Sequence, residues 1–174
     1  ERQKSLEYFN QSLRLFQSVG DKVGEASVLQ DISGIYNALG ESQRALDYMH
    51  LSLSKSKEVR DRTRQAWATT NIGALHNNLG DGTRALQYFN QALSLYREIG
   101  DTYGEGLTLR SIGQVYVNFR DWPKALEYFN QALPLTKAQN DRRWTEAMVL
   151  TSLGFSNHYS GNTQVAIQYL NEAL

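Results

Sequence analysis

The nine residues ALQYFNQAL at positions 85–93 decide the fold, because they recur along the chain. Close copies are SLEYFNQSL at 5–13 and ALEYFNQAL at 125–133, and weaker copies are ALDYMHLSL at 45–53 and AIQYLNEAL at 166–174. Successive copies begin 40 residues apart, and the last begins 41 residues after its predecessor. A fixed period of this length is typical of a protein that stacks similar structural units.

Each period contains two segments with the pattern of an amphipathic helix. Apolar residues recur at spacings of three and four in 102–119 and again in 122–139, so that they share one face of each helix. Asp residues stand where a first helix should be capped, and Gly residues stand where a helix should end. These residues are Asp21, Asp61, Asp101 and Asp141, and Gly20, Gly40, Gly80, Gly100 and Gly161.

The period resembles the tetratricopeptide repeat, whose signature is Trp-x2-Leu-Gly-x2-Tyr, then Ala-x3-Phe, then Pro. In the copy at 101–140 the matching residues are Ile112, Gly113, Tyr116, Ala125 and Phe129. The leading Trp is replaced by Leu109 in this copy, and the final Pro is absent. The period of 40 residues exceeds the usual length of about 34. It resembles the longer variant of kinesin light chains and of bacterial, often cyanobacterial, regulatory proteins.

The sequence therefore predicts an all-α fold, namely a right-handed α-solenoid of antiparallel helix hairpins with about nine helices. We expect residues 1–174 to be a single array that is a fragment of a longer protein. Its units are the second helix of a truncated repeat at 1–20, repeats at 21–60, 61–100 and 101–140, and a repeat truncated in its second helix at 141–174.

Pro134 is expected to disturb the second helix of its repeat. It falls about twelve residues into that helix, where it removes a backbone N–H and clashes with the preceding turn. We expect either a kink at this point or an early end of the helix near Leu133.

The composition argues against several classes of function. The 174 residues hold 18 Lys and Arg against 18 Asp and Glu, and they include no Cys. A chain without a basic excess is not expected to bind nucleic acid or an anionic membrane. The lack of Cys excludes thiolate catalysis and Cys-based zinc sites, and the sequence contains no motif for zinc hydrolysis, nucleotide phosphates or calcium. We expect no enzymatic activity, no metal and no cofactor.

The expected binding site is the concave face, which the first helix of each repeat lines in stacks of helical hairpins. Ser33, Gly73, Gly113 and Gly154 fix the register, and groove-facing positions are counted from them. The predicted peptide-binding residues are Gln30, Asp31, Asn37, Trp67, Asn71, Asn77, Asn78, Leu107, Arg110, Gln114, Asn118, Phe155, His158 and Tyr159.

Asn is frequent among these positions. An amide side chain donates and accepts hydrogen bonds at once, which suits the backbone of an extended peptide. The alternative is that Asn is ordinary near the end of a helix, where Asn37, Asn77 and Asn118 lie. Asn71 is more informative, because it lies in mid-helix, where intrinsic propensity disfavours it.

Trp67 is the expected apolar anchor, because Trp is enriched among the residues that dominate binding energies. The alternative is that Trp67 packs between two hairpins. Arg110 could pair with a carboxylate of the ligand, or it could merely balance the charge of Glu105.

The sequence thus predicts a protein–protein interaction module that binds an extended peptide or a helix of a partner. The alternative is an intramolecular scaffold or regulatory spacer that packs on an attached effector domain, with no separate ligand. Apolar edges at the two ends of the array would permit end-to-end self-association. A cytoplasmic location is the default expectation, because the first residues lack the apolar core of a signal peptide.

Overall fold

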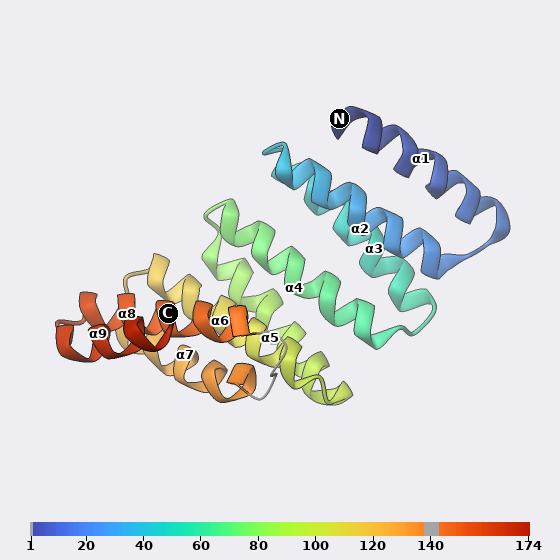
Figure 1. Ribbon diagram of the computed structural model, residues 1–174. Helices are drawn as coiled ribbons and strands as arrows, with labels where there is room; N and C mark the ends of the chain where they lie inside the picture. Colours follow the sequence, from blue (N-terminus) through green and yellow to red (C-terminus); the bar gives the residue numbers. More distant parts are fainter. Residues whose placement is uncertain (1, 138–142) are drawn as a thin grey trace. The chain divides into compact units, whose positions relative to one another are not determined.

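The computed structural model describes residues 2–137 and 143–174, which form nine α-helices and no strand (Figure 1). The helices are α1 (Arg2–Val19), α2 (Lys22–Ala38), α3 (Ser42–Glu58), α4 (Arg62–Asn78), α5 (Gly82–Ile99), α6 (Thr102–Asn118), α7 (Trp122–Lys137), α8 (Arg143–Tyr159) and α9 (Thr163–Glu172). The prediction of an all-α solenoid of helical repeats is confirmed.

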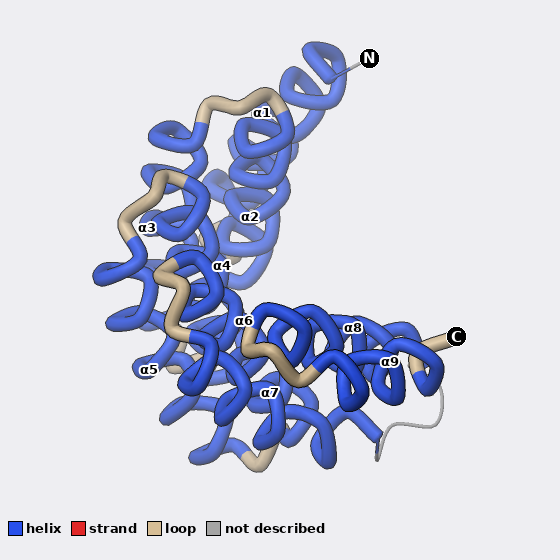
Figure 2. Tube along the Cα trace, turned by 90° about the vertical axis from the view of Figure 1, so that its left-hand side faces the viewer, coloured by secondary structure: helices blue, strands red, loops and turns tan. Residues whose placement is uncertain are grey.

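The chain forms two compact units, residues 1–81 with α1–α4 and residues 82–174 with α5–α9. In the first unit α2 packs on α1 and α3, and α4 packs on α3; in the second, α6 packs on α5 and α7, and α8 packs on α7 and α9. Short loops join the successive helices of the first unit (Figure 2). The boundary between the units falls inside the repeat that the sequence predicts at 61–100.

The helix ends follow the predicted caps. The carboxylates of Asp21, Asp61 and Asp101 each accept a hydrogen bond of 2.9 Å from a backbone N–H three residues later. This bond satisfies one of the donors that the first turn of a helix leaves free. The predicted cap Asp141 lies outside the described residues.

Several turns require a backbone conformation with positive φ. Gly supplies it at Gly20, Gly40, Gly80, Gly100 and Gly161. Arg60 takes the place of this Gly in the turn between α3 and α4, with φ of 57°. Arg120 takes it in the turn between α6 and α7, with φ of 58°. A residue with a Cβ pays roughly 1–2 kcal/mol for this conformation, so the repeat geometry imposes the turn even where the residue does not favour it.

The predicted early end of a helix at Leu133 is wrong, because α7 continues through Pro134 to Lys137. Pro134 is exposed, so its ring and the carbonyl that lacks an N–H partner can face water. Water can therefore bond the carbonyl that Pro134 leaves without a donor, but exposure does not remove the clash of its ring with the preceding turn.

The close approach of two helices within a hairpin depends on a small residue opposite a large one. A Cβ built on Gly113 of α6 would lie 2.6 Å from a ring carbon of Phe129 in α7, and one built on Gly154 of α8 would lie 2.6 Å from Leu170 in α9. Ser33 fills the same position in α2, opposite a hairpin partner that carries the smaller Met49. Its hydroxyl donates a hydrogen bond of 2.7 Å to the carbonyl of Ala45 in α3.

A stacked pair of tyrosines closes two of these hairpins. The rings of Tyr36 and Tyr48 lie 5.3 Å apart, and those of Tyr116 and Tyr128 lie 5.4 Å apart. Arg44 lies over the ring of Tyr36, and Lys124 lies over the ring of Tyr116. The Tyr of the repeat signature therefore packs against the second helix of its own hairpin.

A buried carboxylate joins α2 to α3. Glu25 is only 1% exposed, and its oxygens lie 2.7 Å from Lys22 Nζ and 3.5 Å from Lys55 Nζ. The hydrogen bond from Lys22, with the charge of Lys55, holds the pKa of Glu25 below its ordinary value despite burial. The ion pair therefore stabilises the folded state only while Glu25 is ionised.

Replacing Gly113 by Ser is expected to lower the free energy of unfolding. Overpacking costs about 1–3 kcal/mol, which exceeds the roughly 0.5 kcal/mol that Ser gains over Gly in helix propensity. The double variant Gly113→Ser/Phe129→Met copies the pair Ser33 and Met49 and should be more stable than Gly113→Ser alone. Urea unfolding followed by circular dichroism measures both, and a single variant as stable as the wild type would contradict the close approach.

Replacing Glu25 by Gln is expected to destabilise the protein at neutral pH by about 1–3 kcal/mol, because two lysines lose a charged partner. Since the pKa of Glu25 is lowered on folding, its contribution is complete above the ordinary carboxyl range and is lost as the pH falls through the folded value. Unfolding free energies from pH 7 to pH 3 should therefore converge for the two proteins. Glu7→Gln, at an exposed position of α1, serves as the control, and an equal loss in both variants would refute the assignment.

Candidate functional site

The first unit contains a narrow groove between α2 and α4, which we call the amide groove. Its volume is about 80 Å³. The residues that line it are Gln30, Ser33, Gly34, Asn37, Met49, Trp67, Asn71, Ala74, Leu75 and Asn78. Five of the seven binding residues predicted in this unit are therefore brought together, whereas Asp31 and Asn77 do not line the groove.

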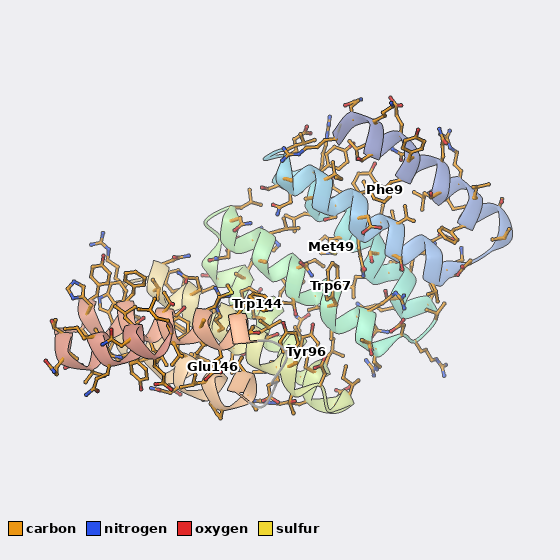
Figure 3. All side chains as sticks on the ribbon, viewed as in Figure 1. Phe9, Met49, Trp67, Tyr96, Trp144 and Glu146 are labelled. Carbon is orange, nitrogen blue, oxygen red and sulfur yellow. The ribbon has the colours of Figure 1, made fainter. Side chains whose placement is uncertain are left out.

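Trp67 lines the amide groove with Met49, and 44% of its surface is exposed (Figure 3). Its ring therefore presents a large apolar surface beside the amides, as an anchor for a ligand would. Asn71 has one of its two N–H groups committed, because Nδ2 donates a 2.8 Å hydrogen bond to the carbonyl of Trp67. Asn71 thus retains one N–H and its oxygen for a ligand.

The second unit contains a larger groove between α6 and α8, which we call the aromatic groove. Its volume is about 650 Å³, which falls within the usual range of ligand sites. The residues that line it are Arg110, Gln114, Val117, Trp122, Trp144, Ala147, Met148, Thr151, Ser152, Phe155, Ser156 and Tyr159. Four of the predicted residues are among them, whereas Leu107, Asn118 and His158 are not.

Exposed aromatic side chains form the walls of the aromatic groove. Trp144 is 57% exposed, Phe155 is 55% exposed and Tyr159 is 62% exposed. The ring of Trp122, at the start of α7, stacks on Tyr159 with the centroids 5.0 Å apart and the planes 14° apart. This stack fixes one wall of the groove, because it ties the start of α7 to the end of α8.

The sequence analysis missed Trp122 and Trp144 as site residues, although the repeat contained a signal for both. At the position of Trp122 the other copies carry Ser42, Gly82 and Thr163, and at the position of Trp144 they carry Val23, Thr63 and Tyr103. Because the other repeats carry different residues at these two positions, the packing of the repeat does not require a Trp there. It can therefore serve a site particular to its own hairpin.

Among the described residues that line the aromatic groove, Arg110 is the one charged residue. Its Nε is buried and has no hydrogen-bond partner among the described residues. Glu105, which the sequence offered as a balancing charge, instead accepts a 2.7 Å hydrogen bond from Arg97. Burial lowers the pKa of the Arg110 guanidinium, and no carboxylate offsets this effect.

The two grooves place an unpartnered donor at the same position of the repeat. Gln30 and Arg110 each stand three residues before the small residue of their helix, and Gln30 Nε2 and Arg110 Nε both lack a partner among the described residues. In the facing helices this position holds Thr70 and Thr151, whose hydroxyls donate to carbonyls of their own helices. Unsatisfied buried donors are costly, so a ligand that accepts from them would gain binding energy.

Residues 2–137 and 143–174 contain no group of three His, Asp or Glu that could hold a metal ion. None of the helices in this part of the chain is long and apolar enough to cross a membrane.

Comparison with known proteins agrees with the repeat. Residues 64–138 match the sequence model of the tetratricopeptide repeat. No curated protein sequence matches the chain. The crystal structure of BtubC from P. vanneervenii is 17% identical with a TM-score of 0.88, and the match covers 99% of this chain and 71% of that one.

Two further structures share the fold. A Rap protein complexed with competence and sporulation factor is 15% identical with a TM-score of 0.84, and the match covers 97% of this chain and 46% of that one. A putative kinesin light chain from Podospora anserina is 12% identical with a TM-score of 0.76, and the match covers 99% of this chain and 84% of that one. The chain therefore spans about half the length of the Rap protein. At these identities the likeness concerns the fold alone.

Replacing Arg110 by Met is expected to raise the free energy of unfolding by about 1 kcal/mol, because the variant keeps the length of the side chain and removes an unsatisfied buried donor. Arg84→Met, at an exposed position of α5, is the matched control and should change little. Urea unfolding measures both. A loss of stability in the Arg110 variant would mean that its guanidinium has a partner in the folded chain.

Proposed function

Since residues 64–138 match the tetratricopeptide repeat, we propose that the chain is a protein-interaction module in which each groove can hold an extended segment of a partner protein. The observation that carries this proposal is the pair of unpartnered donors, Gln30 Nε2 and Arg110 Nε, each beside exposed aromatic side chains. A fold that needs neither the donors nor the aromatic surface for its own packing has them available for a ligand.

The amide groove suits the backbone of an extended peptide. Gln30, Asn37, Asn71 and Asn78 can each donate and accept, as each peptide unit does. Four such contacts at about 1 kcal/mol each give roughly 4 kcal/mol, which only equals the low end of the cost of association. Trp67 must therefore supply apolar burial before binding becomes favourable.

A structure with the same fold was crystallised in complex with competence and sporulation factor. This complex supports a binding role for such an array, while its low identity leaves the ligand of the present chain to be found. We propose that the module has no catalytic activity of its own and needs no cofactor.

The test is to select binders from a displayed library of random 12-residue peptides and to measure them by fluorescence polarisation. Peptides bound in the amide groove should lose at least about tenfold in affinity with Trp67→Ala/Asn71→Ala, since a central Trp commonly contributes 2 kcal/mol or more. The control Leu51→Ala/Gln43→Ala also removes one apolar and one amide side chain, both exposed on α3, and should bind within about twofold of the wild type.

Circular dichroism must show that each variant remains folded. Equal binding of the peptides by the wild type and by Trp67→Ala/Asn71→Ala would show that they do not bind in the amide groove. If no peptide were enriched on the wild type, the proposal would be refuted, and a scaffold that packs on another part of a longer chain would be favoured.

A further inference from the structure

Among the described residues, the lining of the aromatic groove carries one positive charge. Arg110 is the only Lys or Arg of this described lining, which includes no Asp or Glu. No ion pair of Arg110 is found among the described residues, and Glu105 pairs with Arg97 instead. The groove therefore offers an uncompensated guanidinium to whatever enters it.

A second polar group in the same groove also lacks a partner. Ser156 of α8 is 1% exposed, and its Oγ has no hydrogen-bond partner among the described residues. Its hydroxyl can donate, and so can each N–H of the guanidinium. Both unsatisfied groups can thus be satisfied by an acceptor with more than one oxygen, and a carboxylate is the acceptor that matches Arg in charge and geometry.

The remaining lining is apolar and aromatic. Trp144, Phe155 and Tyr159 are each more than half exposed, and Met148 lies between them along α8. A free carboxylate would leave this surface in contact with water. A ligand that covers it must carry large apolar groups beside the carboxylate.

The position of Arg110 along the groove selects the source of the carboxylate. In the repeat Arg110 is level with Thr151, which lies midway along the α8 residues that line the groove, from Trp144 to Tyr159. These residues span about 23 Å of helix, a length that roughly seven residues of an extended chain would cover. The guanidinium therefore faces the middle of a segment that fills the groove. A carboxylate at that point belongs to a Glu or Asp side chain, because the terminal carboxylate of the segment would lie at one end of the groove.

We infer that the aromatic groove selects a partner segment in which a Glu or Asp side chain lies between large apolar residues. This inference rests on the proposed function, because it names the segment that the second unit would bind. It assigns the carboxylate to Arg110 and Ser156 and the apolar residues to the aromatic walls. At the equivalent position the amide groove carries the neutral Gln30, so the two grooves differ in the charge that they accept.

The experiment separates this inference from the proposed function. A displayed library of random 12-residue peptides is selected in parallel on the wild type, on Arg110→Met and on the control Arg84→Met. The wild type and the control should enrich the same acidic sequences flanked by aromatic or aliphatic residues. Arg110→Met should not enrich them.

Synthetic peptides then provide a measurement that needs no variant protein. Changing Glu to Gln in an enriched peptide should weaken its binding to the wild type by about tenfold to a hundredfold, since hydrogen bonds between charged groups are the stronger ones. Arg110→Glu should bind the peptide in which this Glu is replaced by Lys more tightly than it binds the original peptide.

The possible failures are distinct. If the wild type enriched no acidic peptide that Arg110→Met fails to enrich, or if the Glu and Gln peptides bound equally, the inference would be overturned and the interaction module would remain. If no peptide were enriched on the wild type, both would fall.

Discussion

The hairpins of this chain depend on the contact between a small residue in one helix and a large side chain in the next. Gly113 meets Phe129 and Gly154 meets Leu170 at a distance that leaves no room for a Cβ. Because this contact sets how closely the two axes approach, it also sets where the faces of the first helix point. Residues of α2 and α4 line the groove of the first unit, and residues of α6 and α8 line that of the second.

The repeat constrains the contact and leaves the groove free to vary. Ser33 replaces Gly only in the copy in which Met49 replaces Phe, so the two positions keep their combined fit. In contrast, the groove position that holds Gln30 in one unit holds Arg110 in the other, and neither Gln30 Nε2 nor Arg110 Nε has a hydrogen-bond partner among the described residues. One backbone arrangement thus presents two surfaces of different chemistry.

Most of the fold could be predicted from the sequence, because each helix and cap recurs with the period. Asp21, Asp61 and Asp101 cap their helices as the pattern indicates. Pro134 was predicted either to kink its helix or to end it near Leu133, and the early end is wrong because α7 continues to Lys137. Only the structure shows that this residue is exposed. The groove was predictable only where it follows the register of the repeat, as with Trp67 and Arg110. Trp122 was not predicted, because groove positions were counted only along the first helix of each repeat and Trp122 lies in a second helix.

The stack of Trp122 on Tyr159 joins the start of α7 to the end of α8, with centroids 5.0 Å apart. One wall of the aromatic groove is thus shared between two successive hairpins. The smallest piece that could carry this site into another protein is therefore the three-helix block α6–α8, and not a single repeat. A 40-residue cassette cut at the period of the sequence would divide the aromatic pair and leave half a groove in each product.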